Sequence, residues 1–293
     1  MRALVLSLVA AATWLLAACE SSPAPAAPAL WRVADADSEI WLFGSVHVLP
    51  ANLAWRSQRV NTAFAASAEL VTETDVREPA RASFPALVAR YGASPHGIGL
   101  SGRLAAAESA RLARLAHELG LDLTTLERLR PWLAALQLSY ASASRAGHVA
   151  EAGVEAVLVA EAQRNGQRLS FLETPEQQIR TLAGLTPADE LHFLAVTIRQ
   201  IEEEPDLIDR LDDAWARGDI AELARQLDGQ WREAGAGVHN ALILERNRAW
   251  ADEIAHRLAG SGRVFVAVGA AHLVGEGSVI ALLRARGIEV DGP

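Results

Sequence analysis

The apolar and polar residues of this chain form two kinds of pattern after residue 30. An apolar run rich in β-branched and aromatic residues at 40–48 predicts a strand buried on both faces, and further strands are predicted at 69–75, 168–172 and 263–268. Shorter runs predict a hairpin partner at 30–33 and a last strand at 288–290. Amphipathic stretches predict helices at 54–68, 85–91, 104–119, 123–129, 132–144, 154–165, 175–185, 187–217, 220–227, 240–258 and 278–286.

Two helix boundaries carry specific signals. Asn165 is followed by Gly166, which can end a helix by adopting a positive φ. Thr174 can cap a helix whose first residue is Pro175. Strands near both ends and in the middle of the chain, separated by helices, predict an α/β fold. We expect one domain over 30–293, with a mixed central sheet flanked by helices and large helical insertions at about 80–165 and 187–240.

The first residues have the pattern of an export signal. Met1 and Arg2 precede an apolar stretch that ends in Leu-Ala-Ala before Cys19, and this stretch is shorter than the ~20 residues of a membrane span. We therefore expect a signal peptide over 1–18. Leu-Ala-Ala-Cys is similar to a bacterial lipobox, which implies lipidation of Cys19. The alternative is an ordinary cleaved signal with a cysteine that lies nearby by chance.

The segment 19–29 is expected to tether the domain to a membrane. It follows Cys19 with a Pro/Ala-rich stretch that has no large apolar side chain for a core. Glu20 stands where Asp is the usual signal for retention in the inner membrane. The expected location is therefore the periplasmic face of the outer membrane, with the lipid as anchor.

Composition excludes several classes of function. Cys19 is the only cysteine, so no intrachain disulfide and no thiol nucleophile are expected. All 27 basic residues are arginine, which excludes a Schiff-base lysine and the lysine of a P-loop. The net charge is −9 with scattered arginines, so nucleic acid is not expected as a partner. The sequence also lacks the motifs of serine hydrolases, HExxH metalloproteases and dinucleotide-binding proteins.

Two histidines follow predicted strands in matching Gly-x-x-His motifs. Gly44 precedes His47 and Gly269 precedes His272, each where a buried strand gives way to a loop. Ligands bind at such strand ends in α/β sheets. If the two strands are neighbours, the two imidazoles can meet.

Two glutamates occupy equivalent positions. Glu73 and Glu173 end two further predicted strands. Imidazole and carboxylate together suit zinc, manganese, iron or cobalt, and such a metal lowers the pKa of its water towards ~7. Individually, each residue has a simpler explanation, because a strand-end His often bonds a backbone carbonyl and a Glu often caps the next helix. Their joint occurrence favours a site.

The sequence resembles the TraB/GumN family, which includes TIKI-like proteins. The matching segments in chain order are 43–48 (FGSVHV), 70–75 (LVTETD), 172–178 (LETPEQQ), 245–250 (ERNRAW), 268–275 (VGAAHLVG) and 282–287 (LLRARG). Three positions depart from the family pattern: Ser45 replaces the commoner Thr, Ala271 replaces Gly, and Glu155 replaces Asp. The longer Glu155 is left outside the core of the site for this reason.

The resemblance implies a fold shared with TIKI metalloproteases, erythromycin-esterase-like (EreA) enzymes and haem-binding ChaN-like proteins. It also implies that His47, Glu73 and His272 are core residues of the site, with Arg246 and Asn247 nearby. A guanidinium at Arg246 could bind a substrate carboxylate or stabilise an oxyanion, although a salt bridge on the helix surface would explain it equally well.

The remaining histidines belong to no motif and are interpreted as surface residues: His96, His117, His148, His192, His239 and His256.

These observations predict a hydrolase that depends on a divalent metal such as Mn, Co or Zn. His47, Glu73 and His272 are the expected ligands, with Glu173 as a further ligand or general base. The expected substrate is a peptide or a small ester or amide. Two alternatives remain: a protein that binds haem or metal without turnover, and an envelope interaction protein with a vestigial site.

Overall fold

The computed structural model describes residues 26–94 and 97–293. The predicted signal peptide, Cys19 and most of the tether lie outside the described residues, as does His96. In the described part of the chain, no helix has the length and hydrophobicity needed to cross a membrane.

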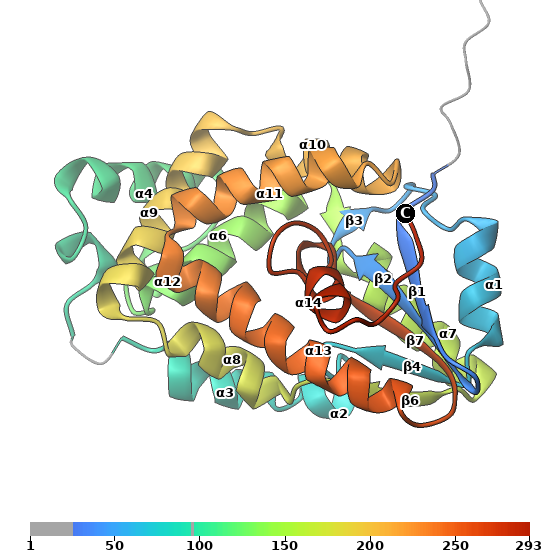
Figure 1. Ribbon diagram of the computed structural model, residues 1–293. Coiled ribbons are helices and arrows are strands. Elements are labelled where there is room, and N and C mark those ends of the chain that lie inside the picture. Colours follow the sequence, from blue (N-terminus) through green and yellow to red (C-terminus); the bar gives the residue numbers. More distant parts are fainter. Residues whose placement is uncertain (1–25, 95–96) are drawn as a thin grey trace, which may run out of the picture.

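A five-stranded sheet forms the centre of the fold (Figure 1). In spatial order its strands are β1 (Leu30–Ala34), β2 (Ser38–Ser45), β7 (Gly262–Gly269), β4 (Glu69–Thr72) and β6 (Arg168–Phe171). The last four are parallel to one another, whereas β1 is antiparallel to β2. The mixed sheet and the hairpin predicted from the sequence are thus confirmed, and the four principal predicted strands lie side by side.

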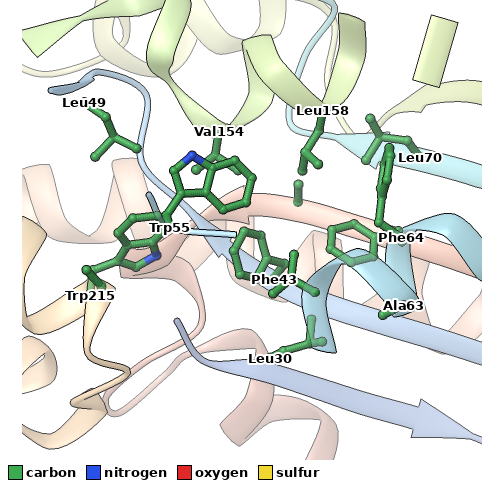
Figure 2. Close-up of a cluster of buried hydrophobic side chains, with 14 of the residues drawn as sticks. Leu30, Phe43, Leu49, Trp55, Ala63, Phe64, Leu70, Val154, Leu158 and Trp215 are labelled. Carbon is green, nitrogen blue, oxygen red and sulfur yellow. The ribbon is translucent and has the colours of Figure 1, made fainter. Parts of the chain in front are cut away.

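Helices cover both faces of this sheet. On one face, α1 (Gln58–Ala66) and α7 (Val154–Asn165) contribute to an apolar core around Phe43 and Phe265 (Figure 2). On the other face, α13 (Glu245–Leu258) and α14 (Val279–Ala285) pack against alternate residues of the same strands. Coverage on both sides explains why β2 and β7 are apolar almost without interruption.

The remaining helices form a lobe beside the carboxyl ends of the parallel strands (Figure 1). Its elements are α2 (Glu78–Arg81), α3 (Phe84–Gly92), η1 (Leu100–Gly102), α4 (Ala106–Glu118), α5 (Leu123–Leu126), α6 (Pro131–Arg145), α8 (Pro175–Ala183), α9 (Pro187–Glu203), α10 (Leu207–Ala216) and α11 (Ile220–Ala234). The long helices α4, α6 and α9 pack together around their own apolar core.

Short elements complete the chain. A two-stranded ribbon pairs β3 (Leu49–Pro50) with β5 (His148–Val149), and single turns lie at η2 (Ala150–Ala152) and η4 (Ala270–His272). A continuous helical rod consists of α12 (Ala236–His239), the π-helical segment η3 (Asn240–Leu244) and α13.

The helix boundaries confirm the local signals and correct some lengths. Gly166 ends α7 with a φ of 68°, and Thr174 caps α8, whose first residue is Pro175. The helix predicted over 187–217 is two helices, because Pro205 lies in the break between α9 and α10 and cannot donate a helical hydrogen bond. The last predicted strand at 288–290 is wrong: this segment is irregular, and only the adjacent Asp291 forms an isolated bridge to Arg32.

Candidate functional site

The carboxyl ends of the four parallel strands bring the predicted site residues to one edge of the sheet. Ser45 of β2 is in register with Gly269 of β7, so the two Gly-x-x-His motifs lie on neighbouring strands. A Cβ placed on Gly269 would lie 3.9 Å from Nε2 of His47 and 3.4 Å from Cδ2 of His272. Ring atoms of the two imidazoles are therefore at most 7.3 Å apart, the sum of these two distances, which is within the ~10 Å separation beyond which shared metal ligation would be excluded.

His47 has one ring nitrogen engaged and one that faces the site. Its Nδ1 lies 2.8 Å from Oε1 of Glu155, and this oxygen also accepts a 2.5 Å hydrogen bond from Ser45. Glu155 is buried at the start of α7, whereas the His47 side chain is 65% exposed. Glu155 thus orients an imidazole that solvent and ligands can reach.

His272 is held in the same way from the opposite side. Its Nδ1 lies 2.7 Å from Oδ1 of Asn247, and the Asn247 amide donates a 2.9 Å hydrogen bond to the carbonyl of Gly277. The bond to Gly277 fixes the amide orientation, so Nδ1 of His272 is the donor and Nε2 carries the lone pair. The indole of Trp250 packs on the ring at a centroid distance of 4.4 Å. Asn247 is fully buried and contacts His272, so it positions that ring and does not itself face the cavity.

Glu73 lies between the two histidines. Its Oε1 accepts a 2.7 Å hydrogen bond from the backbone N–H of Gly269 and lies 3.8 Å from Nε2 of His272. Its Oε2 accepts a 2.7 Å bond from Arg246 and a long contact of 3.4 Å from Gln178. A Cβ at position 269 would lie 3.1 Å from Oε1 of Glu73, so a larger residue there would require this carboxylate to move by a few tenths of an ångström, while both imidazoles would stay at ordinary contact distance.

Arg246 links the acidic and basic groups of the site. Its guanidinium forms a two-pronged ion pair with Glu173, at 2.8 and 3.1 Å, and a further bond to Glu73. A third nitrogen donates to Nε2 of His272 at 3.1 Å. Arg246 therefore belongs to the site and is not a surface salt bridge of α13. Thr174, and not Glu173, caps α8. The carboxylate of Glu173 instead binds Arg246.

These contacts shift the pKa values of both histidines and of Glu73. The charge of Glu155 raises the pKa of His47. Burial raises the pKa of Glu73, but His47, Arg246 and His272, which is itself protonated at the low pH where Glu73 titrates, outweigh this effect and bring that pKa down to about 2. Burial lowers the pKa of His272 to about 3, which keeps its imidazole neutral. The site thus combines an ionised carboxylate with a neutral imidazole whose lone pair faces it.

Two cavities meet at the site. One, of about 560 Å³, extends under the helical lobe, and apart from the site residues it is lined mainly by apolar side chains. The other, of about 620 Å³, extends along α7 and the loop after β4, and its lining contains more polar and charged residues than that of the first. His47, Glu73, Phe84 and Gln178 line both. The site is therefore reached from two chemically different sides.

The sequence missed or misjudged two residues. Glu155, left outside the predicted core, is the partner of His47. The sequence signal for it was its place in the family pattern, where Glu155 stands instead of the commoner Asp. His148, interpreted as a surface residue, is fully buried and bonds Asp212 at 2.8 Å, because β5 turns it inward beneath α10. His117, His192 and His256 are exposed as expected, and His239 is half-buried against Trp231.

The described residues contain no group of three or more His, Cys, Asp or Glu side chains that could already hold a metal ion. The guanidinium of Arg246 lies next to Nε2 of His272 and next to Glu73. The predicted ligands are neighbours, but an arginine cation lies among them.

Comparison with known proteins places these features in one family. The model of the TraB/PrgY/gumN family matches residues 29–292, nearly the whole described chain. The protein YbaP of Escherichia coli (strain K12) is 26% identical over 245 residues, which cover 83% of this chain and 87% of YbaP. An uncharacterized protein of Treponema pallidum (strain Nichols) is 23% identical over 298 residues, covering 92% and 87% of the two chains. No solved structure matches significantly.

Proposed function

Since this chain belongs to the TraB/PrgY/gumN family, we propose that the site at its sheet edge is a divalent-metal hydrolase centre acting on peptides or related amides and esters. The observation that carries the proposal is the paired orientation of the two histidines. Each commits Nδ1 to a neighbour, Glu155 or Asn247, and turns Nε2 towards Glu73. Metal-binding histidines typically have such partners on the other ring nitrogen, which fix tautomer and orientation.

Two of the proposed donor atoms lie close to the spacing that a small divalent cation requires. Ligand atoms on a tetrahedral metal with ~2.0–2.2 Å bonds are about 3.3–3.6 Å apart. Nε2 of His272 and Oε1 of Glu73 are 3.8 Å apart, so a small movement would suffice. His47, Glu73 and His272 would hold the metal, and Mn, Co or Zn suits this set of nitrogen and oxygen donors.

Arg246 must move away from Nε2 of His272 before a metal can bind there. Its contact with Nε2 of His272 competes with ligation, whereas its ion pair with Glu173 does not. We therefore assign Glu173 the task of retaining Arg246 near the site once that contact is given up. His47 must also lose a proton, because Glu155 raises its pKa, and metal uptake should strengthen with rising pH.

Glu73 and Arg246 would then have different roles beside the metal. A bound divalent metal would supply a Lewis acid and lower the pKa of water towards ~7. Glu73, with a pKa of about 2, suits a ligand better than a proton acceptor near neutral pH. Arg246 lies on the wall of the apolar cavity and can donate N–H groups to a carbonyl oxygen as negative charge develops there.

Metal analysis combined with activity assays tests the proposal. Protein purified without chelator is analysed for metal, and peptidase and esterase activities are measured with added manganese, cobalt or zinc. The variants His47→Ala and His272→Ala should lose both metal and activity, whereas His117→Ala, an exposed histidine on α4, should retain both. Equal metal content and activity in all four proteins would refute the proposal.

The same assays separate the alternatives. Histidine-dependent metal uptake without cleavage would favour a binding protein, and a Soret band on addition of haem, lost in His47→Ala, would favour haem. Neither metal nor haem uptake would favour an interaction protein with a vestigial site.

We also propose that the domain is a lipoprotein anchored through Cys19 at the periplasmic face of the outer membrane. The Leu-Ala-Ala-Cys segment and the Pro/Ala-rich stretch after it support this. Labelled fatty acid should appear on the wild type and be absent from Cys19→Ala, which should also leave the membrane fraction. Membrane association of an unlabelled wild type would contradict the proposal.

A further inference from the structure

The two cavities at the site indicate which kind of substrate the proposed hydrolase would bind. Both reach His47 and Glu73, and they diverge from there. A substrate whose reacting carbonyl lies at the site therefore has room on both sides. This arrangement suits an extended chain better than a small molecule that fills one pocket.

The cavity under the helical lobe is strongly apolar. Three tryptophans from three helices line it, Trp132 of α6, Trp215 of α10 and Trp231 of α11, together with leucines and isoleucines of α8, α10, α11 and η3. Its volume of about 560 Å³ falls in the ~300–1,000 Å³ range of pockets that enclose a whole ligand. It offers more space than a single side chain needs.

The cavity is also accessible, which distinguishes it from a packing defect of the core. Leu136 on α6 lines it and is nevertheless 39% exposed. Large apolar side chains on accessible concave surfaces are typical of ligand sites. By contrast, the second cavity is bordered by carboxylates and amides such as Glu78, Glu151 and Gln163, and it suits a polar, solvated segment.

Resting on the proposed function, we propose that the substrates are peptides with two or more consecutive bulky apolar residues on one side of the cleaved bond and a polar segment on the other. The apolar residues bind under the helical lobe among the three indoles. The polar segment leaves along α7. Recognition is by apolar burial, so the preference is for size and hydrophobicity and not for one particular side chain.

Binding can be tested without catalysis. Two ten-residue peptides are compared that differ only in a central Leu-Leu-Phe or Ser-Ser-Asn segment. Binding to the full domain, with chelator present, is followed by the tryptophan fluorescence of the protein, to which the three pocket indoles contribute. The apolar peptide is expected to bind at least about tenfold more tightly, because each buried apolar side chain contributes roughly that factor.

A matched pair of variants locates the binding. Leu136→Glu places a charge in the lining and should weaken binding of the apolar peptide at least about tenfold. Tyr140→Glu, one turn further along α6 on a residue that is 58% exposed and outside that lining, should change it less than about twofold. Circular dichroism checks that both variants are folded.

The outcomes distinguish this inference from the proposed function. Equal affinity for the two peptides, or equal effects of the two variants, would overturn the inference even if hydrolysis is observed. Tight, Leu136-dependent binding of the apolar peptide without metal-dependent cleavage would support the pocket assignment and count against the hydrolase.

Discussion

Asn247 provides the sharpest test of how the site is built. It is fully buried and bonds Nδ1 of His272 and the carbonyl of Gly277 at 2.7 and 2.9 Å. Asn247→Ala leaves a buried N–H and a half-buried carbonyl without this partner. Each such group costs about 1–3 kcal/mol, so the free energy of unfolding should fall by about 2–4 kcal/mol, allowing for water at Gly277.

The same change should weaken metal binding. Without the Asn247 acceptor, the His272 ring can rotate and exchange tautomers, and loss of such a partner typically lowers metal affinity 10–100-fold. Urea denaturation of the metal-free protein measures the first effect, and titration calorimetry with zinc or manganese measures the second. Asn247→Asp keeps the acceptor but loses the donor to Gly277, so it should lose stability and retain more of the metal affinity.

Asn240→Ala is the matched control, because Asn240 lies earlier on the same helical rod and forms only an exposed hydrogen bond to Glu245. Its unfolding free energy should change by less than about 0.5 kcal/mol. If Asn247→Ala loses no more than this control, the reasoning about buried hydrogen bonds is wrong. If stability falls while metal affinity is unchanged, His272 is not a ligand.

Three further predictions concern the fold and its pH dependence. The pKa of Glu73 is about 2 in the folded chain, against 4.5 in the unfolded chain, so the stability that its charge contributes is present above about pH 4.5 and is lost as the pH falls towards 2. In metal-free Glu73→Gln, the decrease in unfolding free energy on acidification should therefore be smaller by about 3 kcal/mol, as measured by urea titrations at each pH. Gly153→Ala should destabilise the fold by about 1–3 kcal/mol and weaken metal binding, since the new Cβ would collide with the backbone carbonyl of His47. Gly229→Ala is the control: it has open space on α11 and should stabilise the fold by about 0.5–1 kcal/mol, and equal shifts of the melting temperature in the two variants would contradict this prediction. Phe265→Ala removes a ring whose centroid lies 5.8 Å from that of Phe43 and 5.4 Å from that of Phe64. The unfolding free energy, measured by denaturant titration, should fall by about 3–5 kcal/mol, and a decrease below 1 kcal/mol would mean that this core repacks freely.

The sequence was sufficient for the strand ends and for much of the site. β2 and β7 are apolar almost without interruption, so their ends are visible as the points where polar residues begin, and this located His47 and His272. β4 and β6 contain polar residues as well, but Glu73 and Glu173 were also located at their ends. The two imidazoles were expected to meet on the condition that their strands are neighbours, and the pairing of β2 with β7 meets this condition.

What the sequence could not provide were contacts that depend on helix placement. Glu155 reaches His47 from the first turn of α7, and Arg246 reaches Glu73 and Glu173 from α13; neither distance follows from periodicity. His148 was misjudged for the same reason, because its burial depends on how α10 lies over β5. The strand predicted at 288–290 was wrong because a short apolar run fits an irregular packed segment equally well.

The position of β7 in the sheet has a consequence for how the protein reaches its folded state. This strand lies between β2 and β4, yet it is the last strand in the chain. Until it is synthesised, β2 and β4 expose edges to which other chains can add, and the histidine loop after β2 lacks its counterpart. Closing a sheet from strands so distant in sequence is slow, because the entropy of the intervening loops must be overcome first. A chain truncated before β7 should therefore be a substrate for chaperones and proteases and not a partly active domain.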